Sequence, residues 1–222
     1  MAVTYPKLNV KIVATHCGLS VGPDGATHQA LEDISVMRSL PNMTVVVPCD
    51  AYEAYAATMA LAEMKGPAYM RMGRSEFPVI ISQDCKFQIG KATVMREGDD
   101  VSIIACGQMV GAALEAAETL ASEGISAEVV NMSTIKPLDE EAVKATASKT
   151  GAVVTVEEHS IIGGLGSAVA EFLSENLPTP LVRVGTRDTF GESGDADELL
   201  KKYGLTASDL VAAAKNAINK KR

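Results

Sequence analysis

Apolar residues recur along this chain with two periods, in short runs typical of strands and in spaced stretches typical of amphipathic helices. In the first part, three predicted strands alternate with two predicted helices: Val10–Thr15, Ala30–Leu40, Met43–Pro48, Ala51–Lys65 and Ala68–Met72. Asp50 stands where the N-cap of the second helix belongs, and Gly66-Pro67 ends that helix. The stretch from Phe77 to Phe87 has no clear period and contains a proline, so we interpret it as a linker.

The alternation starts again beyond this stretch. The predicted strands are Lys91–Met95, Val101–Cys106, Ala127–Asn131, Ala152–Glu157 and Leu181–Val184. The predicted helices are Gly111–Ser122, Asp139–Lys149, Leu165–Asn176, Asp197–Tyr203 and Leu210–Lys220, the last preceded by a capping-box pattern at Thr206–Asp209. Strands alternating with helices predict an α/β fold with mainly parallel sheets and right-handed crossovers. We expect two α/β domains, residues 1–78 and 91–222, joined by a linker over residues 79–90.

The first predicted domain is small for its class. Three strands and two helices leave a parallel sheet short of the cover that it needs on both faces and at its edges. We therefore expect residues 1–78 to form an incomplete domain.

Composition sets limits on the function. The chain has 222 residues, of which 47% are hydrophobic and 22% charged, as is ordinary for a soluble globular protein. Its formal net charge of −8 argues against nucleic acid and membranes as partners. The four cysteines lack disulfide-frame and zinc-ligand spacing, so we expect free thiols in a reducing compartment. Because the sequence shows neither a membrane-spanning apolar run nor a signal-peptide pattern, we expect the protein to be cytoplasmic.

The loop after the first predicted strand gathers polar side chains suited to chemistry. It holds His16 and His28, two of the three histidines, with Asp24 between them. Open α/β sheets bind ligands at the carboxyl ends of their strands, where helix N-termini also favour anions. Arg74 follows the third predicted strand at the same sheet edge, and its guanidinium suits phosphate. Each side chain alone also has a structural explanation, such as the Pro-Asp-Gly turn at Asp24, but the shared edge favours a site.

Two other motifs are interpreted as structural. Gly163-Gly164-Leu165-Gly166 follows a strand and opens a helix, yet it lacks the last glycine and the acidic residue of a dinucleotide-binding fingerprint. Close helix packing explains these glycines better. Glu157-Glu158-His159 has no second group of ligands beside it, so no metal site is predicted.

Several segments resemble the transketolase family. The segments Tyr5–His16, Gly25–Gln29 and Arg38–Met43 resemble its pyrimidine-binding domain. The segments Gly107-Gln108, Asn131–Asp139 and Phe190–Gly194 resemble its C-terminal domain. The resemblance covers nearly the whole chain and is closest to the separately encoded C-terminal section of split transketolases. It implies a thiamine-diphosphate-binding type of first domain, of which this chain has the second half, and a transketolase C-terminal type of second domain.

The resemblance also implies a reaction and roles for four residues. Transketolases transfer a two-carbon ketol unit between sugar phosphates through thiamine diphosphate with Mg²⁺. His16 and Arg74 match the residues that bind the phosphate of the acceptor, and Asp24 matches the aspartate that binds a substrate hydroxyl. His28 matches the catalytic histidine beside the reacting carbons, where proton transfer and oxyanion stabilisation are needed.

Some parts that the family needs are absent from this sequence. A Glu in a Gly-Ile-Ala-Glu-Gln type motif and a following aromatic residue hold the aminopyrimidine in the family, and both lie upstream of the segments matched here. The diphosphate and Mg²⁺ site belongs to another domain, so the cofactor-binding residues of this chain stay unknown. We expect a fragment that is inactive alone, acts with an N-terminal transketolase section or missing residues of the same gene, and forms a homo-oligomer.

Two other functions remain open. A related thiamine enzyme, such as a deoxyxylulose-phosphate synthase or the β subunit of a 2-oxoacid dehydrogenase, shares the fold. The segments Asn131–Asp139 and Phe190–Gly194 favour transketolase over these. A non-catalytic assembly module is the third interpretation, because the acidic second domain has no chemical motif.

Overall fold

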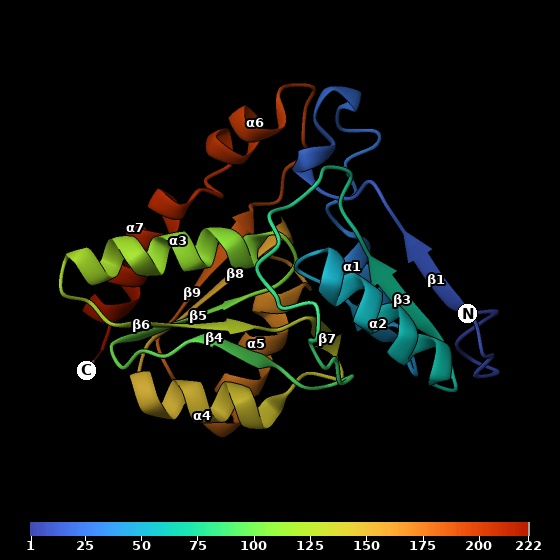
Figure 1. The fold of residues 1–222 in the computed structure, drawn as a ribbon, viewed down its shortest axis with the longest axis horizontal. Coiled ribbons are helices and arrows are strands. Elements are labelled where there is room, and N and C mark those ends of the chain that lie inside the picture. The colour runs from blue at the N-terminus through green and yellow to red at the C-terminus, as the bar shows by residue number, and fades with distance from the viewer. Residues whose placement is uncertain (222) are drawn as a thin grey trace.

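In the computed structural model, which describes residues 1–221, the strands form two sheets (Figure 1). The first sheet has the order β1-β3-β2-β7, formed by Lys11–Ala14, Ala68–Arg71, Thr44–Val46 and Thr134–Lys136. The second has the order β4-β6-β5-β8-β9, formed by Thr93–Arg96, Ala127–Asn131, Val101–Ala105, Val153–Ser160 and Leu181–Thr186. Within these residues only the pairs β2–β7 and β4–β6 are antiparallel. The predicted α/β fold with mainly parallel sheets is confirmed.

Helices cover these sheets. They are the 3-10 helix η1 (Leu19–Asp24) and the α-helices α1 (Asp33–Ser39), α2 (Ala51–Glu63), α3 (Met109–Ser122), α4 (Glu140–Thr150), α5 (Leu165–Asn176), α6 (Ala196–Lys202) and α7 (Ala207–Asn219). Figure 1 shows α3 and α7 on one face of the second sheet and α4 and α5 on the other. In the first sheet, neighbouring residues of β2 point to opposite faces. Val46 packs with α2, whereas Val45 packs with Ile34 of α1.

Strand β7 connects the two parts of the chain. It comes from the second predicted domain but pairs with β2 in the first sheet, where Thr134 lies opposite Val46. Its Ile135 is buried in one hydrophobic core with Val45 of β2 and Ile104 of β5. The sequence analysis did not predict this strand, because three residues are too few to show a period. The two sheets therefore share a core.

The predicted linker is tied to the first sheet. Residues 77–87 form neither helix nor strand, as expected. Asp50 is the N-cap of α2, as predicted, and one of its oxygens accepts the N–H of Glu53 at 2.9 Å. Its other oxygen accepts the N–H groups of Ile80 at 2.8 Å and Ile81 at 2.7 Å. One buried carboxylate thus holds the start of α2 and the linker together.

The predicted helix boundaries hold in part. Thr206 and Asp209 form the predicted capping box at the start of α7. The predicted helix Ala30–Leu40 is shorter, since α1 begins at Asp33, and η1 was not predicted. Among residues 1–221, no helix combines the length and the apolar character needed to cross a membrane.

Candidate functional site

Two loops meet at the carboxyl ends of β1 and β3. These strands are parallel neighbours with Ala14 opposite Arg71, so the residues that follow them emerge at one edge of the sheet. Cys17 joins the two loops, because its thiol donates to the Met72 carbonyl at 2.9 Å. Burial raises the pKa of this thiol to about 12. Cys17 is therefore a protonated packing residue at neutral pH, and it places the loop of the two histidines beside the loop of the arginine.

Arg74 directly contacts the loop Thr15–Gln29, which carries His16 and His28 and is called the histidine-bearing loop below. Its guanidinium lies 3.3 Å from Asp24 Oδ1 and donates to the Val21 carbonyl at 2.8 Å. Arg74 and Asp24 are 50 positions apart in the sequence, and the sequence analysis placed both at this edge. Their side chains are 41% and 39% exposed, so a ligand can reach both.

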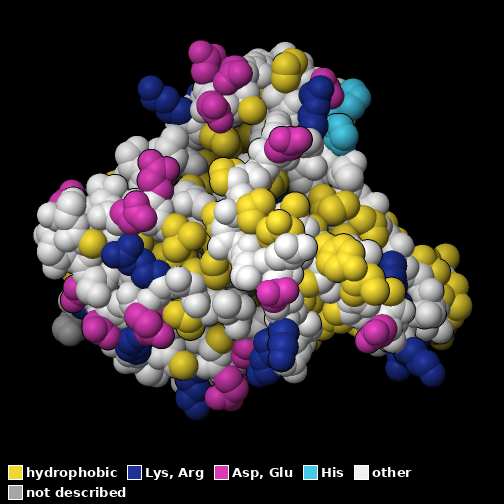
Figure 2. All heavy atoms as spheres, in the orientation of Figure 1, with side chains coloured by type: hydrophobic (Ala, Val, Ile, Leu, Met, Phe, Trp, Pro, Cys, Tyr) yellow, Lys and Arg dark blue, Asp and Glu magenta, His cyan; other side chains and the backbone are white. Residues whose placement is uncertain are grey.

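The two histidines of this loop face solvent. His16 has φ 63°, a left-handed conformation that is uncommon outside glycine. Its Nδ1 lies 2.9 Å from the Thr15 hydroxyl, and Nδ1 of His28 lies 3.0 Å from the Thr27 hydroxyl. No hydrogen bond in residues 1–221 occupies either Nε2 atom, so each stays available to a ligand. Figure 2 shows histidine side chains together at one corner of the molecule beside a Lys or Arg side chain.

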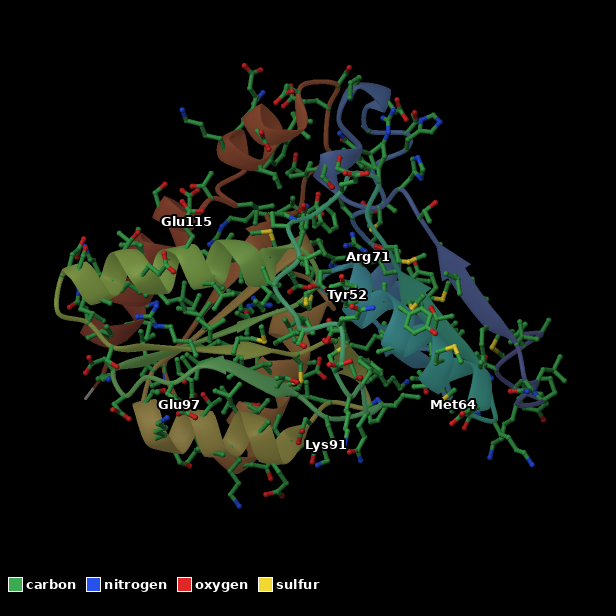
Figure 3. The ribbon with its side chains drawn as sticks, in the orientation of Figure 1. Tyr52, Met64, Arg71, Lys91, Glu97 and Glu115 are labelled. Atoms are coloured by element: carbon green, nitrogen blue, oxygen red, sulfur yellow. The ribbon has the colours of Figure 1, made fainter. Side chains whose placement is uncertain are left out.

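A buried polar cluster packs against this loop. Arg71 is only 4% exposed, and its Nε lies 2.9 Å from Asp33 Oδ2. Its Nη2 donates to the carbonyls of Ala30 at 3.0 Å and Glu158 at 2.9 Å, and Figure 3 shows it on the side of β3 that faces the second sheet. The Glu158 carboxylate in turn accepts the N–H of Ser20 at 2.6 Å. The sequence analysis did not predict this cluster. The only sign of it in the sequence was a charged residue, Arg71, at the end of the buried strand β3.

The remaining charged residues of β8 have structural roles. The Glu157 carboxylate accepts the N–H groups of Leu165 and Gly166, both at 2.7 Å, and so caps the N-terminus of α5. Burial raises the pKa of Glu157 to about 7 and lowers the pKa of His159 to about 4. A side chain at Gly164 would overlap the Glu157 carboxylate. Close packing therefore explains this glycine, as interpreted from the sequence.

Ligands for a metal ion are not grouped in the described part of the chain. Residues 1–221 contain no group of three or more His, Cys, Asp and Glu side chains that fits a metal ion. The donor set therefore does not fit the Mg²⁺–diphosphate part of the cofactor that the family resemblance implies.

Comparison with known families identifies this fold. The family model described as "Transketolase, pyrimidine binding domain" matches residues 1–79, and that described as "Transketolase, C-terminal domain" matches residues 90–210. The chain belongs to the transketolase family, whose members depend on thiamine diphosphate. The family resemblance seen in the sequence is confirmed.

Several relatives cover almost the whole chain. A transketolase C-terminal section of Methanocaldococcus jannaschii is 52% identical over 94% of this chain and 66% of its own length. The 6-deoxy-6-sulfo-D-fructose transketolase subunit SqwH of Clostridium sp. is 50% identical over 100% of this chain and 69% of its own. A solved split-gene transketolase, described as an inactive beta4 tetramer, superimposes with a TM-score of 0.94 at 55% identity, over 99% of this chain and 70% of its own. The chain thus spans about two thirds of the length of these relatives.

Proposed function

We propose that this chain supplies the substrate-binding edge of a two-section transketolase, which transfers a two-carbon ketol unit between sugar phosphates. The observation that carries the proposal is the contact of Arg74 with Asp24 and Val21. This contact joins the loop after β3 to the loop that bears both histidines. Four polar side chains from two distant segments therefore share one exposed edge.

Phosphate binding is the role we assign to Arg74 and His16. A guanidinium donates two parallel hydrogen bonds to phosphate oxygens, and a nearby imidazole Nε2 adds a third. When ionised, the Asp24 carboxylate accepts hydrogen bonds and donates none, so it suits a sugar hydroxyl rather than the phosphate. The acceptor is then oriented with its phosphate at Arg74 and a hydroxyl toward Asp24.

His28 is the residue we assign to proton transfer. Thr27 binds its Nδ1, which leaves Nε2 to take a proton from a substrate hydroxyl or to return one. Thiamine diphosphate, when bound, supplies the electron sink for the reacting carbon. His28 holds and moves the proton that accompanies each change at the substrate oxygen.

The cofactor's diphosphate and Mg²⁺ are assigned to a partner section. No cluster of metal ligands occurs in residues 1–221. A relative 55% identical to this chain is described as an inactive tetramer of β chains, which supports a chain that is inactive alone. We propose an N-terminal transketolase section as the partner and sugar phosphates as substrates.

The test combines the purified chain with a purified N-terminal transketolase section. Calorimetry should show binding of thiamine diphosphate with Mg²⁺ by the mixture and not by this chain alone. Ketol transfer between pentose phosphates should appear in the same mixture, and condensation of pyruvate should not. Ketol transfer by this chain alone would contradict the need for a partner. A mixture that binds the cofactor but prefers pyruvate would identify the related synthase instead.

A further inference from the structure

Gln29 makes contacts that its place in the loop does not predict. It follows His28 directly, yet its side chain is only 4% exposed. Its amide nitrogen donates to the Leu19 carbonyl at 3.3 Å and to the Gly22 carbonyl at 3.1 Å, both within the histidine-bearing loop. The same nitrogen donates to the Glu192 carbonyl at 2.9 Å, which lies 163 positions further along the chain. One amide thus joins both sides of the loop to a segment of the C-terminal part.

The segment that receives Gln29 is shaped to fit it. A side chain at Gly191 would overlap the Gln29 amide oxygen and press on Leu19. Ser193 of the same segment donates its hydroxyl to the Pro23 carbonyl at 2.6 Å. Figure 1 shows this region, which leads into α6, beside η1. The segment Gly191–Ser193 therefore binds the histidine-bearing loop through two hydrogen bonds, one at Gln29 and one at Pro23.

The backbone of this loop needs support at several points, in addition to its contacts with Met72, Arg74 and Glu158. Gly18, Gly22 and Gly25 all have positive φ, and glycine loses more conformational entropy on ordering than any other residue. His16 and His28 lie at the two ends of this glycine-rich stretch. Their ring positions relative to Arg74 then depend on bonds made in its interior.

We propose that Gln29 is a positioning residue, which locks the histidine-bearing loop onto Gly191–Ser193 and so sets His16 and His28 for a phosphorylated substrate. This proposal rests on the proposed function of the site. It also gives the C-terminal part of the chain a role in substrate binding, although none of the four assigned substrate side chains comes from it.

The test uses inorganic phosphate as the probe and histidine ring signals in NMR as the readout, on the full chain. Gln29→Met keeps the volume of the side chain and removes its three hydrogen bonds. Gln83→Met is the matched control, because Gln83 is exposed and lies in the linker. In the wild-type chain and the control, phosphate should shift the signal of His16 saturably, because His16 is the histidine assigned to phosphate binding. In Gln29→Met the apparent affinity should fall about tenfold, while the signal of buried His159 stays close to wild type and shows that the fold is kept.

A second variant tests the same contact between Gln29 and Gly191, with the substitution made at Gly191. Gly191→Ala places a methyl group against the Gln29 amide and should weaken phosphate binding in the same way. Combined with Gln29→Ala, which makes room for that methyl group, Gly191→Ala should add little further loss. Additive losses of phosphate affinity would show that Gln29 and Gly191 act separately and would overturn the proposed positioning role of their contact.

The outcomes distinguish this proposal from the one on which it rests. If phosphate does not move the His16 signal in the wild-type chain, the phosphate site is wrong and the positioning role of Gln29 fails with it. If the wild type responds and Gln29→Met responds equally, the site stands and the positioning role is wrong. In the two-section enzyme, Gln29→Met should raise KM for a phosphorylated acceptor and leave KM for its unphosphorylated analogue unchanged.

Discussion

Asp24 and Arg74 form an ion pair that a substrate can open at little cost. The side chain of Asp24 is 39% exposed and that of Arg74 is 41% exposed, and ion pairs in contact with solvent contribute roughly 0–1 kcal/mol. A phosphate dianion forms stronger charge-assisted bonds with the guanidinium than one half-exposed carboxylate does. The Val21 carbonyl keeps the arginine in place during the exchange, because it binds the same nitrogen. The free site is thus already arranged for an anion.

Replacing Arg74 by lysine keeps the charge and removes the planar fork. In the proposed two-section enzyme, we expect Arg74→Lys to raise KM for a phosphorylated acceptor about ten- to hundredfold, since a hydrogen bond to a charged group contributes roughly 1.5–3 kcal/mol. Turnover at saturating substrate should change little. Steady-state kinetics checks this, with the exposed Arg187→Lys as the control. An unchanged KM for Arg74→Lys would remove Arg74 from the phosphate site.

Glu157 and His159 give opposite pH dependences of stability. The folded pKa of Glu157 is raised from 4.5 to about 7 by burial, so this carboxyl group loses stabilisation as pH rises from 4.5 to 7. The folded pKa of His159 is lowered from 6.5 to about 4, so stability is lost as pH falls from 6.5 to 4. The two contributions to stability oppose each other between pH 4.5 and 6.5, where the two ranges overlap.

Glu157→Gln removes only the carboxyl contribution. Relative to wild type, the variant should be most destabilised near pH 5, and the difference should shrink toward pH 7 by roughly 1 kcal/mol per pH unit. Urea unfolding at pH 5, 6 and 7 measures this difference. The exposed Glu175→Gln is the control and should show a flat difference. A constant difference for Glu157→Gln as well would contradict the raised pKa.

Among the elements, the short strand β7 connects the two sheets although it has only three residues. Its three residues extend the first sheet, while the strands before and after it in the chain, β6 and β8, belong to the second. Ile135 contributes a side chain to the core between the two sheets and is 1% exposed. This strand therefore contributes directly to the packing of the two parts of the chain.

Truncating Ile135 should therefore destabilise the whole chain. Ile135→Ala removes a buried side chain between two sheets, which typically costs about 2–5 kcal/mol. We expect the melting temperature to fall by roughly 2–4 °C for each kcal/mol of stability that is lost. Val94→Ala on β4 is the control, because Val94 is 49% exposed, and it should change stability by less than about 0.5 kcal/mol. A small effect of Ile135→Ala would show that the two sheets do not share one cooperative core.

These examples show what the sequence could and could not predict. Long elements with a strong period, such as α2 and β5, follow from their own residues, and so does the N-cap at Asp50. The shared edge of His16 and Arg74 follows from the order of strands, because parallel strands end at one edge. β7 and the Gln29–Glu192 contact were missed, because they depend on how distant segments pack. Local patterns carry no signal for such contacts.

At the scale of the whole molecule, α2 has two apolar faces. Ala57 and Leu61 pack on the first sheet, while Tyr55 and Met59, four positions apart on the opposite face, are 69% and 51% exposed. Tyr52 lies one turn earlier on this outer face. Figure 2 shows hydrophobic side chains gathered over the part of the surface where α2 and β1 lie. A helix that is apolar on both sides is typical of one that is covered in its assembly.

This exposed face predicts self-association of the chain when it is purified alone, with a second copy as the covering partner. Light scattering should show a mass that rises with concentration, and Tyr55→Glu with Met59→Glu should return the mass to that of a monomer, because each buried carboxylate would lose its hydration. Val94→Glu, on the second sheet, is the control and should leave the association unchanged. The described relative that forms a tetramer of β chains is consistent with this expectation. A wild-type chain that stays monomeric at all concentrations would show that the outer face of α2 is tolerated in solvent and would contradict the expected homo-oligomer of the chain alone.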